Sequence, residues 1–451
     1  MTTELRHIPL PEPEVALESP TVSVEEYDAR MDALYARCDH AWVVVYGDRE
    51  HAANLSFLCN FDPRFEEALL VLGPPHRRVL LVGNEGVDYA SSTSPNVDVM
   101  LCQSLSLLGQ SRDSAPRLDR GLADIGIGPG DDVGVVGWKY LTAEETDDPG
   151  EPAFVPAFVI AALRRLTGEP LRDCTQELMD AGRGLRTRNS AAQIALFEWG
   201  ATRAAAAVMR IVAGAEPGMT ELEAAGRLGY QGEPLTCHLM LSGGKGTIVG
   251  LRSPTARLLE AGDAVTTAVG YTGGLCARAG LLRREPDDAF FAEIVAPYHN
   301  AIAAWYAAVG VGVEGGAVWH AVLDALESVP FRPALNPGHL VSFEEWLHSP
   351  IRSGGCERLA SGMALQCDII PAPLPRGRAL NCEDTVALAD EQLRGELARD
   401  YADLWRRIER RRAFMCDELG IELGEDVLPL SESGAYLPPF WLDETLVCVR
   451  S

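Results

Sequence analysis

The sequence predicts an α+β protein, and three observations lead to this prediction. Its 451 residues suffice for two or three domains, each with a core of its own. Between about residues 25 and 175, short apolar runs alternate with helical and turn-forming segments, as in an α/β domain. A long amphipathic helix then opens a second part, in which strand-like and glycine-rich segments alternate to about residue 390.

The first domain is expected to span residues 25–180, after an extended N-terminal arm, residues 1–24, whose prolines disfavour a helix. It begins with the helical sequence EEYDARMDALYARC. Four apolar runs predict strands: Trp42–Tyr46, Ala68–Leu72, Val79–Val82 and Val133–Val136. The glycine-rich segment Leu118–Asp131 is expected to be a loop.

The second domain is expected to span residues 181–420. Apolar residues recur at helical spacing from Ser190 to Val212, which predicts one long helix. Thr220 and Glu223 then match the capping box that opens another helix. The charged stretch Glu391–Leu419 is predicted to be a solvated helix, and the tail, residues 421–451, is expected to pack on this domain or on a dimer partner.

Charge and cysteine content exclude several classes of function. The formal net charge of −26 repels nucleic acid and anionic membrane surfaces, so neither is an expected partner. The eleven cysteines form no CxxC pair, which favours reduced thiols over a disulfide framework or a zinc ribbon. The N-terminus lacks the apolar core of a signal peptide, and no run is long enough to span a bilayer. We therefore expect a cytoplasmic protein.

Specific motifs begin after Arg183. In order along the chain they read GLRTRNSAAQIALFEWGATRAA, PGMTELEAA, SPTARLLEAGDAV, GHLVSFEEWLHSP, SGMALQCDIIP and NCEDTVAL. In order and spacing they resemble the catalytic domain of the creatinase, aminopeptidase P and methionine aminopeptidase superfamily. The segment NLSFLCNFDPRFEEALLVLGPP is similar to the non-catalytic N-terminal domain of that superfamily. The resemblance implies an N-terminal creatinase-type α/β domain, then a pita-bread catalytic domain, in a homodimer whose N-terminal domain overhangs the partner's site.

The resemblance also implies where metal ligands would lie. Metallo-members of the family hold two divalent ions with two Asp, one His and two Glu. By position the first Asp falls on Ala268 and the second on Ala277 or its neighbours, and no acidic residue lies between Asp263 and Glu285 to replace them. A dinuclear centre is therefore not expected, and the predicted cofactor is none.

The other three ligand positions fall on His339, Asp368 and Glu383. They leave open a single divalent ion with one free coordination position. Without metal they are the candidate catalytic groups. Creatinase, the metal-free precedent, uses an upstream His whose position here is Leu251, so its mechanism does not carry over.

Three further residues are candidates for substrate binding: Arg278, His348 and Glu345. Arg278 stands near the second lost Asp, where a cation could hold a substrate carboxylate or pair with Asp368 or Glu383. His348 resembles a second family His, and either Glu345 or its neighbour Glu344 could face the pocket. Cys237 and His238 are adjacent on an expected strand and point to opposite faces, so they do not form a catalytic dyad.

Two functions follow as expectations. The first is a metal-independent enzyme that cleaves a small amino-acid-like substrate by acid and base catalysis, by C–N hydrolysis or by elimination or cyclisation. The second is a catalytically inactive pseudo-aminopeptidase that binds a partner, as pita-bread domains of histone chaperones do. An enzyme would keep His339 and two carboxylates around a cavity, whereas a binding module could fill that cavity with apolar side chains.

Overall fold

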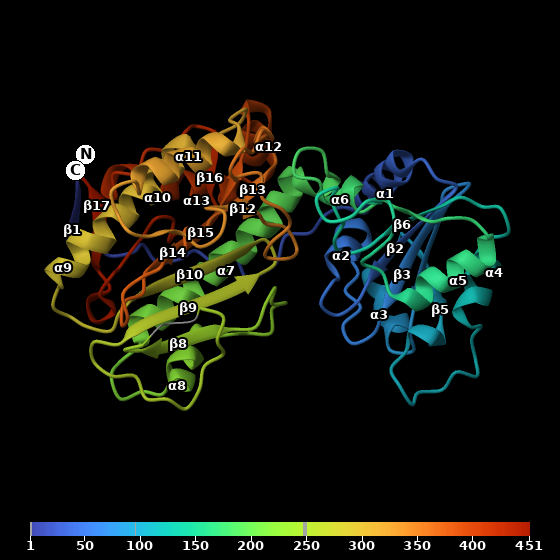
Figure 1. Ribbon diagram of the computed structural model, residues 1–451, viewed down its shortest axis with the longest axis horizontal. Coiled ribbons are helices and arrows are strands. Elements are labelled where there is room, and N and C mark those ends of the chain that lie inside the picture. The colour runs from blue at the N-terminus through green and yellow to red at the C-terminus, as the bar shows by residue number, and fades with distance from the viewer. Residues whose placement is uncertain (1, 95, 247–249) are drawn as a thin grey trace. The chain divides into compact units, whose positions relative to one another are not determined.

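The computed structural model describes residues 2–94, 96–246 and 250–451. The chain forms two compact units (Figure 1). The N-terminal unit is Val22–Thr187, and the C-terminal unit combines the residues before Val22 with Arg188–Ser451. Each unit contains helices and a sheet, which confirms the predicted α+β class.

The N-terminal unit is built on a six-stranded mixed sheet in the order β5-β4-β3-β2-β6-β7. Four of its strands lie where apolar runs predict them, because each run is long enough to cross the buried sheet. The strands are β2 (Trp42–Gly47), β3 (Ala68–Gly73), β4 (Arg77–Val82), β5 (Asp98–Leu101), β6 (Val133–Val136) and β7 (Arg172–Asp173). The pairs β2–β3 and β3–β4 are antiparallel, and the other pairs are parallel.

The helices of this unit include α4, which lies where a loop was predicted. They are α1 (Val24–Cys38), α2 (Ala53–Cys59), α3 (Gly86–Thr93), α4 (Leu118–Ile125), α5 (Ala157–Thr167) and α6 (Gln176–Met179), with short 3-10 turns at Gln103–Leu105 and Leu185–Thr187. The loop predicted over Leu118–Asp131 is wrong for its first half, which forms α4. Leu118, Leu122 and Ile125 lie on one helical face and are buried in the core, and only the glycine-rich second half remains irregular.

The C-terminal unit is built on a seven-stranded antiparallel sheet in the order β12-β13-β15-β10-β9-β8, with β16 also pairing with β15. Its strands are β8 (Met240–Gly244), β9 (Ala264–Tyr271), β10 (Gly274–Leu281), β12 (His339–Leu340), β13 (Ala364–Cys367), β15 (Asn381–Leu388) and β16 (Val427–Pro429). Two small ribbons pair β11 (Arg332–Pro333) with β14 (Pro371–Ala372) and β1 (Thr3–His7) with β17 (Leu446–Arg450).

The helices of this unit are α7 (Ala191–Gly214), α8 (Glu221–Ala225), α9 (Asp288–Phe290), α10 (Ala296–Ala308), α11 (Gly315–Ala325), α12 (Glu391–Asp400) and α13 (Ala402–Ala413). Two 3-10 turns, Gly226–Leu228 and Trp441–Asp443, and two π-helical segments, Phe291–Val295 and Phe414–Glu418, complete the set of helical elements. The predicted long helix is α7, and Thr220 and Glu223 form the predicted capping box of α8. The stretch Glu391–Leu419 is helical, but it is not fully solvated, because Arg411 is buried between Glu198 and Glu432 at 2.7 and 2.9 Å.

Helix α7 packs along β9 and β10 (Figure 1). The contact is closest at the turn between these strands, where the backbone carbonyl of Thr272 faces Gly200. A Cβ at Gly200 would lie 1.9 Å from this oxygen, and one at Gly273 would lie 2.3 Å from the Cα of Phe197. The two glycines therefore hold the helix against the strands that carry Ala268 and Ala277.

The two ends of the chain belong to the C-terminal unit. Strands β1 and β17 pair there, so the N- and C-termini lie side by side (Figure 1). The arm then contacts two helices: the indole of Trp199 on α7 donates to the carbonyl of Ala16 at 3.0 Å, and Arg406 on α13 pairs with Glu14 at 2.8 Å. Tyr436 and Trp441 of the tail are buried in the same unit. None of the helices in the described part of the chain is long and apolar enough to cross a membrane.

We predict that Gly200→Ala destabilises the protein by about 1–3 kcal/mol, although alanine is the better helix former, because the added methyl overlaps the Thr272 carbonyl. Gly395→Ala is the matched control: Gly395 lies inside α12, and an added methyl would meet no atom within 4 Å, so the variant should gain up to about 1 kcal/mol. Denaturant unfolding measures both, and equal effects of the two substitutions would contradict the close packing.

Candidate active site

One row of residues crosses the large sheet of the C-terminal unit. Met240 is opposite Ala268, Ala268 is opposite Ala277, and Ala277 is opposite Glu383. Residues directly opposite in antiparallel strands point to the same face. The register therefore brings both positions expected for the lost Asp ligands beside Glu383.

His339 reaches this face from the next strands. It pairs with Gln366, and Gln366 pairs with Thr385, two residues after Glu383. Pro337 and Gly338 precede His339, and Gly338 has a φ of 147°, a conformation that favours glycine. The His339 side chain is fully buried. Its Nδ1 lies 3.3 Å from the Leu340 carbonyl, and because a carbonyl only accepts, Nδ1 donates in this contact.

Residues 341–347 form a loop that covers His339. The loop is closed by two backbone hydrogen bonds, from Leu340 N–H to the His348 carbonyl at 2.7 Å and from Leu347 N–H to the Leu340 carbonyl at 2.9 Å. Trp346 stacks on the His339 ring with centroids 4.1 Å apart. Glu345 Oε1 lies 3.0 Å from His339 Nε2, although the geometry is not that of a hydrogen bond. Trp346 and Glu345 keep partial exposure, so the loop is the side on which solvent meets the cluster.

Glu383 is the second carboxylate near His339, with Oε1 at 3.9 Å from Nε2. Gln366 holds Glu383 in place: its Nε2 donates to Glu383 Oε1 at 3.2 Å and to the Leu275 carbonyl at 2.7 Å, and its Oε1 accepts from Thr385. Gln366 and Trp346 are site residues that the sequence analysis missed. Both lie in quoted motifs, but a family pattern of ionisable ligands does not single them out.

Burial and mutual repulsion shift the protonation of this cluster. Burial raises the pKa of Asp368 to about 6, with His339 lowering and Glu345 raising the pKa. Burial, and then the charges of Asp368 and Glu345, raises the pKa of Glu383 well above its usual range. Burial opposes protonation of His339, but the close approach and charge of Glu345 outweigh it and raise the pKa of His339. Glu383 therefore holds its proton to a higher pH than an ordinary carboxyl group, and Asp368 beside it titrates near pH 6.

An apolar cluster of Met240, Ala268, Leu275 and Ala277 adjoins these groups. Partly buried Cys237 packs against it, and the Glu345 charge contributes to a raised pKa of the Cys237 thiol, after burial. Cys237 thus lies at the edge of the site. Cys237 and His238 do not form a catalytic dyad in the structure. His238 Nε2 instead contacts the Leu251 carbonyl at 3.1 Å.

Arg278 requires a correction. It pairs with Cys382 in the register, one residue away from the Ala277–Glu383 pair, so its side chain points to the opposite face of the sheet. There Nη2 contacts Asp384 Oδ2 at 2.7 Å, and Nε donates to the Tyr436 carbonyl at 2.9 Å. Arg278 is fully buried and is not available to hold a substrate carboxylate beside Glu383.

Of the other candidates for substrate binding, Glu345 approaches His339 with its side chain, whereas Glu344 and His348 contribute backbone carbonyls. Of the two neighbouring glutamates, Glu345 approaches His339, whereas Glu344 contributes a backbone carbonyl that accepts from Ser342 at 3.1 Å. His348 closes the loop through its backbone carbonyl.

The donor set fits at most one metal ion. The described residues contain one group of three possible ligands, His339, Glu345 and Glu383, whose ligand atoms lie within 4.8 Å of one another. Glu345 takes the place that the sequence analysis gave to Asp368. The two Asp positions that would bridge a second ion are alanines in the apolar cluster. A single ion there would polarise a bound carbonyl or water.

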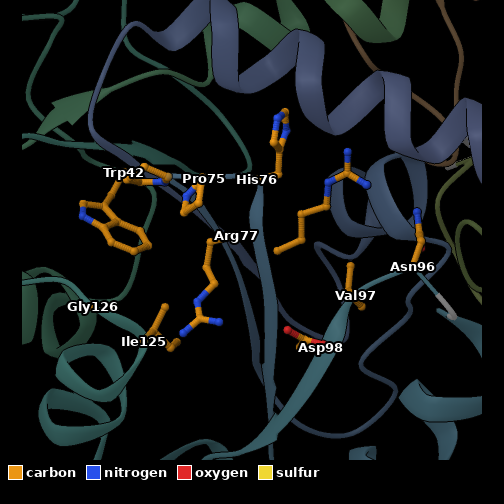
Figure 2. A pocket seen from close by; sticks show the side chains of 11 residues that line it. Trp42, Pro75, His76, Arg77, Asn96, Val97, Asp98, Ile125 and Gly126 are labelled. Carbon is orange, nitrogen blue, oxygen red and sulfur yellow. The ribbon is translucent and has the colours of Figure 1, made fainter.

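A cavity of about 840 Å³ lies elsewhere, at one end of the sheet of the N-terminal unit (Figure 2). Trp42, Arg77 and Asp98 contribute to its lining. Arg78, also in the lining, is already paired with Asp28 and with Asp32. Around His339, by contrast, two carboxylates approach a single imidazole nitrogen, so we take the His339 cluster as the candidate active site.

Comparisons with known proteins concern the fold of the chain. No protein-family model matches the chain, and neither does any curated protein sequence. Solved structures do match. A prolidase from Thermococcus sibiricus has a TM-score of 0.65 at 14% identity, covering 82% of this chain and 96% of its own. The chain has the pita-bread fold of the creatinase and aminopeptidase P superfamily.

Two further matches show how widely this fold is used. A dipeptidase from Mycobacterium ulcerans has a TM-score of 0.59 at 20% identity, covering 82% of this chain and 94% of its own. The N-terminal domain of a FACT complex subunit from chickpea has a TM-score of 0.57 at 14% identity, covering 82% of this chain and 95% of its own. The fold thus confirms the resemblance, and the chemistry has to be argued from the site.

We predict that Asp384→Asn destabilises the protein by about 3–5 kcal/mol, because it leaves the buried Arg278 guanidinium without its counter-ion. The control is Glu314→Gln, which breaks an exposed ion pair with Arg358 and should cost no more than about 1 kcal/mol. Denaturant unfolding at neutral pH compares them. A small effect of Asp384→Asn would mean that Arg278 finds another partner.

A second prediction concerns pH. The pKa of Asp368 is raised in the folded protein to about 6 from an ordinary value of 3.8, so the folded state favours the protonated group. Its stabilising contribution is complete at low pH and is lost as the pH rises through about 6, by roughly 3 kcal/mol. Between pH 4 and 7 the free energy of unfolding should fall for the wild type relative to Asp368→Asn, which has no group to ionise at this position. The exposed variant Asp403→Asn should show the same pH dependence as the wild type. Parallel curves for all three proteins would contradict the raised pKa.

Proposed function

We propose that this chain is a metal-independent enzyme that cleaves a small amino-acid-like substrate by acid and base catalysis, with hydrolysis of a C–N bond as the reaction. The observation that supports this most is the convergence of Glu345 and Glu383 on His339 Nε2, at 3.0 and 3.9 Å. The names of several structures with this fold, prolidase and dipeptidase, add support for a peptide-like substrate.

The protonation of the cluster suggests the roles. Ionised Asp368 takes a proton from water as the water oxygen bonds to the substrate carbon. Protonated Glu383 gives its proton to the nitrogen as the C–N bond breaks. His339 then carries the proton from Asp368 back to Glu383, with its positive charge stabilised by Glu345. Gln366 is a positioning residue, since it fixes the carboxylate of Glu383.

The alternative is a binding module without catalysis. The apolar cluster at the two lost Asp positions supports it, as does the match to a FACT complex subunit. The three carboxylates and the His argue against it, because burying them costs free energy that a passive surface does not need. The homodimer expected from the resemblance stays a prediction, which light scattering tests.

We predict that the purified protein holds less than one equivalent of divalent metal per chain and that its activity survives chelators. Screening amides and short peptides at neutral pH with a chelator present should identify a substrate. His339→Asn and Glu383→Gln should each lower kcat/KM about 100- to 10,000-fold. Exposed His320→Asn and Glu425→Gln are the controls and should be unchanged.

Two outcomes would contradict the proposal. Stoichiometric metal that is lost together with activity would replace it with a metal-dependent mechanism. Turnover that is unchanged in His339→Asn and Glu383→Gln would remove the proposed centre altogether.

A further inference from the structure

The charges of the candidate active site are unbalanced. Asp368, Glu345 and Glu383 supply three carboxyl groups, and His339 is the only basic side chain within ion-pair distance of any of them in the described ranges. The cluster thus lacks a permanent cation. A buried group of this kind either keeps its protons or receives a positively charged ligand.

Two atoms of the cluster have unused hydrogen-bonding capacity. Among the residues that the structure describes, buried Asp368 Oδ1 has no hydrogen-bond partner, and buried His339 Nε2 has only the carboxylate of Glu345 within hydrogen-bond distance, at 3.0 Å and without hydrogen-bond geometry. Both residues are more than nine-tenths buried, so bulk water does not compensate them. Such atoms mark places where a ligand supplies the missing donor.

The position of Arg278 indicates whether the ligand carries a negative or a positive charge. From the sequence, the Arg278 guanidinium was expected to hold a substrate carboxylate or to pair with Asp368 or Glu383. Arg278 instead points to the other face and is saturated by Asp384 and backbone carbonyls. A ligand carboxylate would meet Glu345, Asp368 and Glu383 with no Arg or Lys of the C-terminal unit's described residues paired to them.

The other side chains that adjoin the cluster are apolar and aromatic. Ala268 and Ala277 present methyl groups, and Met240 and Leu275 extend this surface. The Trp346 ring, stacked on His339, keeps an exposed fraction of 37%. Alkyl groups pack on the first surface, and an ammonium group is attracted to the face of an indole.

We propose that the site binds a small organic ammonium compound with an apolar body and without a free carboxylate. Its ammonium group donates to Glu345 and Asp368, and its alkyl part lies on Ala268 and Ala277. This inference rests on the proposed function only in taking this ligand to be the substrate or part of it.

The test is calorimetric titration of the chelator-treated full-length protein with three matched ligands. Isobutylamine carries the ammonium, valine adds a carboxylate to the same skeleton, and isobutanol is the neutral analogue. We expect isobutylamine to bind at least about 10-fold more tightly than valine and isobutanol. Glu345→Gln should weaken isobutylamine binding about 10- to 100-fold, because it removes a charged acceptor. Exposed Glu425→Gln is the control and should bind like the wild type.

Each other outcome overturns the inference. Valine binding as tightly as isobutylamine would mean that a cation from elsewhere serves the site, and the proposed acid and base catalysis would stand. Stoichiometric binding of Mn²⁺ or Zn²⁺ that depends on Glu345, without amine binding, would replace the ligand by a metal ion. If no ligand binds but turnover depends on His339, the ligand class is wrong and the proposed function stands. If turnover is also absent, both are wrong.

Discussion

The antiparallel register of β9, β10 and β15 is the constraint on which the candidate site depends. It sets Ala268, Ala277 and Glu383 in one row across the sheet, so a side chain at any of the three positions shares its environment with the other two. Replacing two acids of such a row by alanine does not disturb the ladder, because the backbone hydrogen bonds are unaffected. Such a change affects only what the row can hold, and in this chain an apolar surface adjoins the Glu383 carboxylate.

In the described segments, buried ionisable groups are paired on one face of this sheet and lack a cationic partner from Arg or Lys on the other. On one face Arg278 and Asp384 form a closed pair whose donors and acceptors are satisfied by Ser433, Tyr436 and each other. On the other, Glu383 and Asp368 have no Arg or Lys among the described residues as a partner and respond through raised pKa values. Pairing favours rigidity, whereas unpaired carboxyl groups exchange protons with their neighbours. The second face is therefore the one suited to chemistry.

The sequence predicted the fold and the row better than it predicted the cluster. The order and spacing of the short motifs predicted which residues would be neighbours in the sheet. Ala268, Ala277, His339 and Glu383 lie close together, as the resemblance implied. Arg278 could not be placed this way, because a shift of one residue along a strand reverses the face. Glu345 and Trp346 lie in a loop whose course depends on the closing contacts of Leu340, which no local pattern encodes. Helix α4 was missed because glycines beyond Ile125 obscured its apolar spacing.

The central claim is that Glu383 carries a proton at neutral pH in a site without metal. An infrared difference spectrum between the wild type and Glu383→Gln, recorded at neutral pH on untreated protein, measures this directly. We predict that the wild type shows the carbonyl band of a protonated carboxylic acid that the variant lacks. A band of ionised carboxylate in its place, especially one that shifts when a chelator is added, would contradict the account and indicate that Glu383 holds a metal ion.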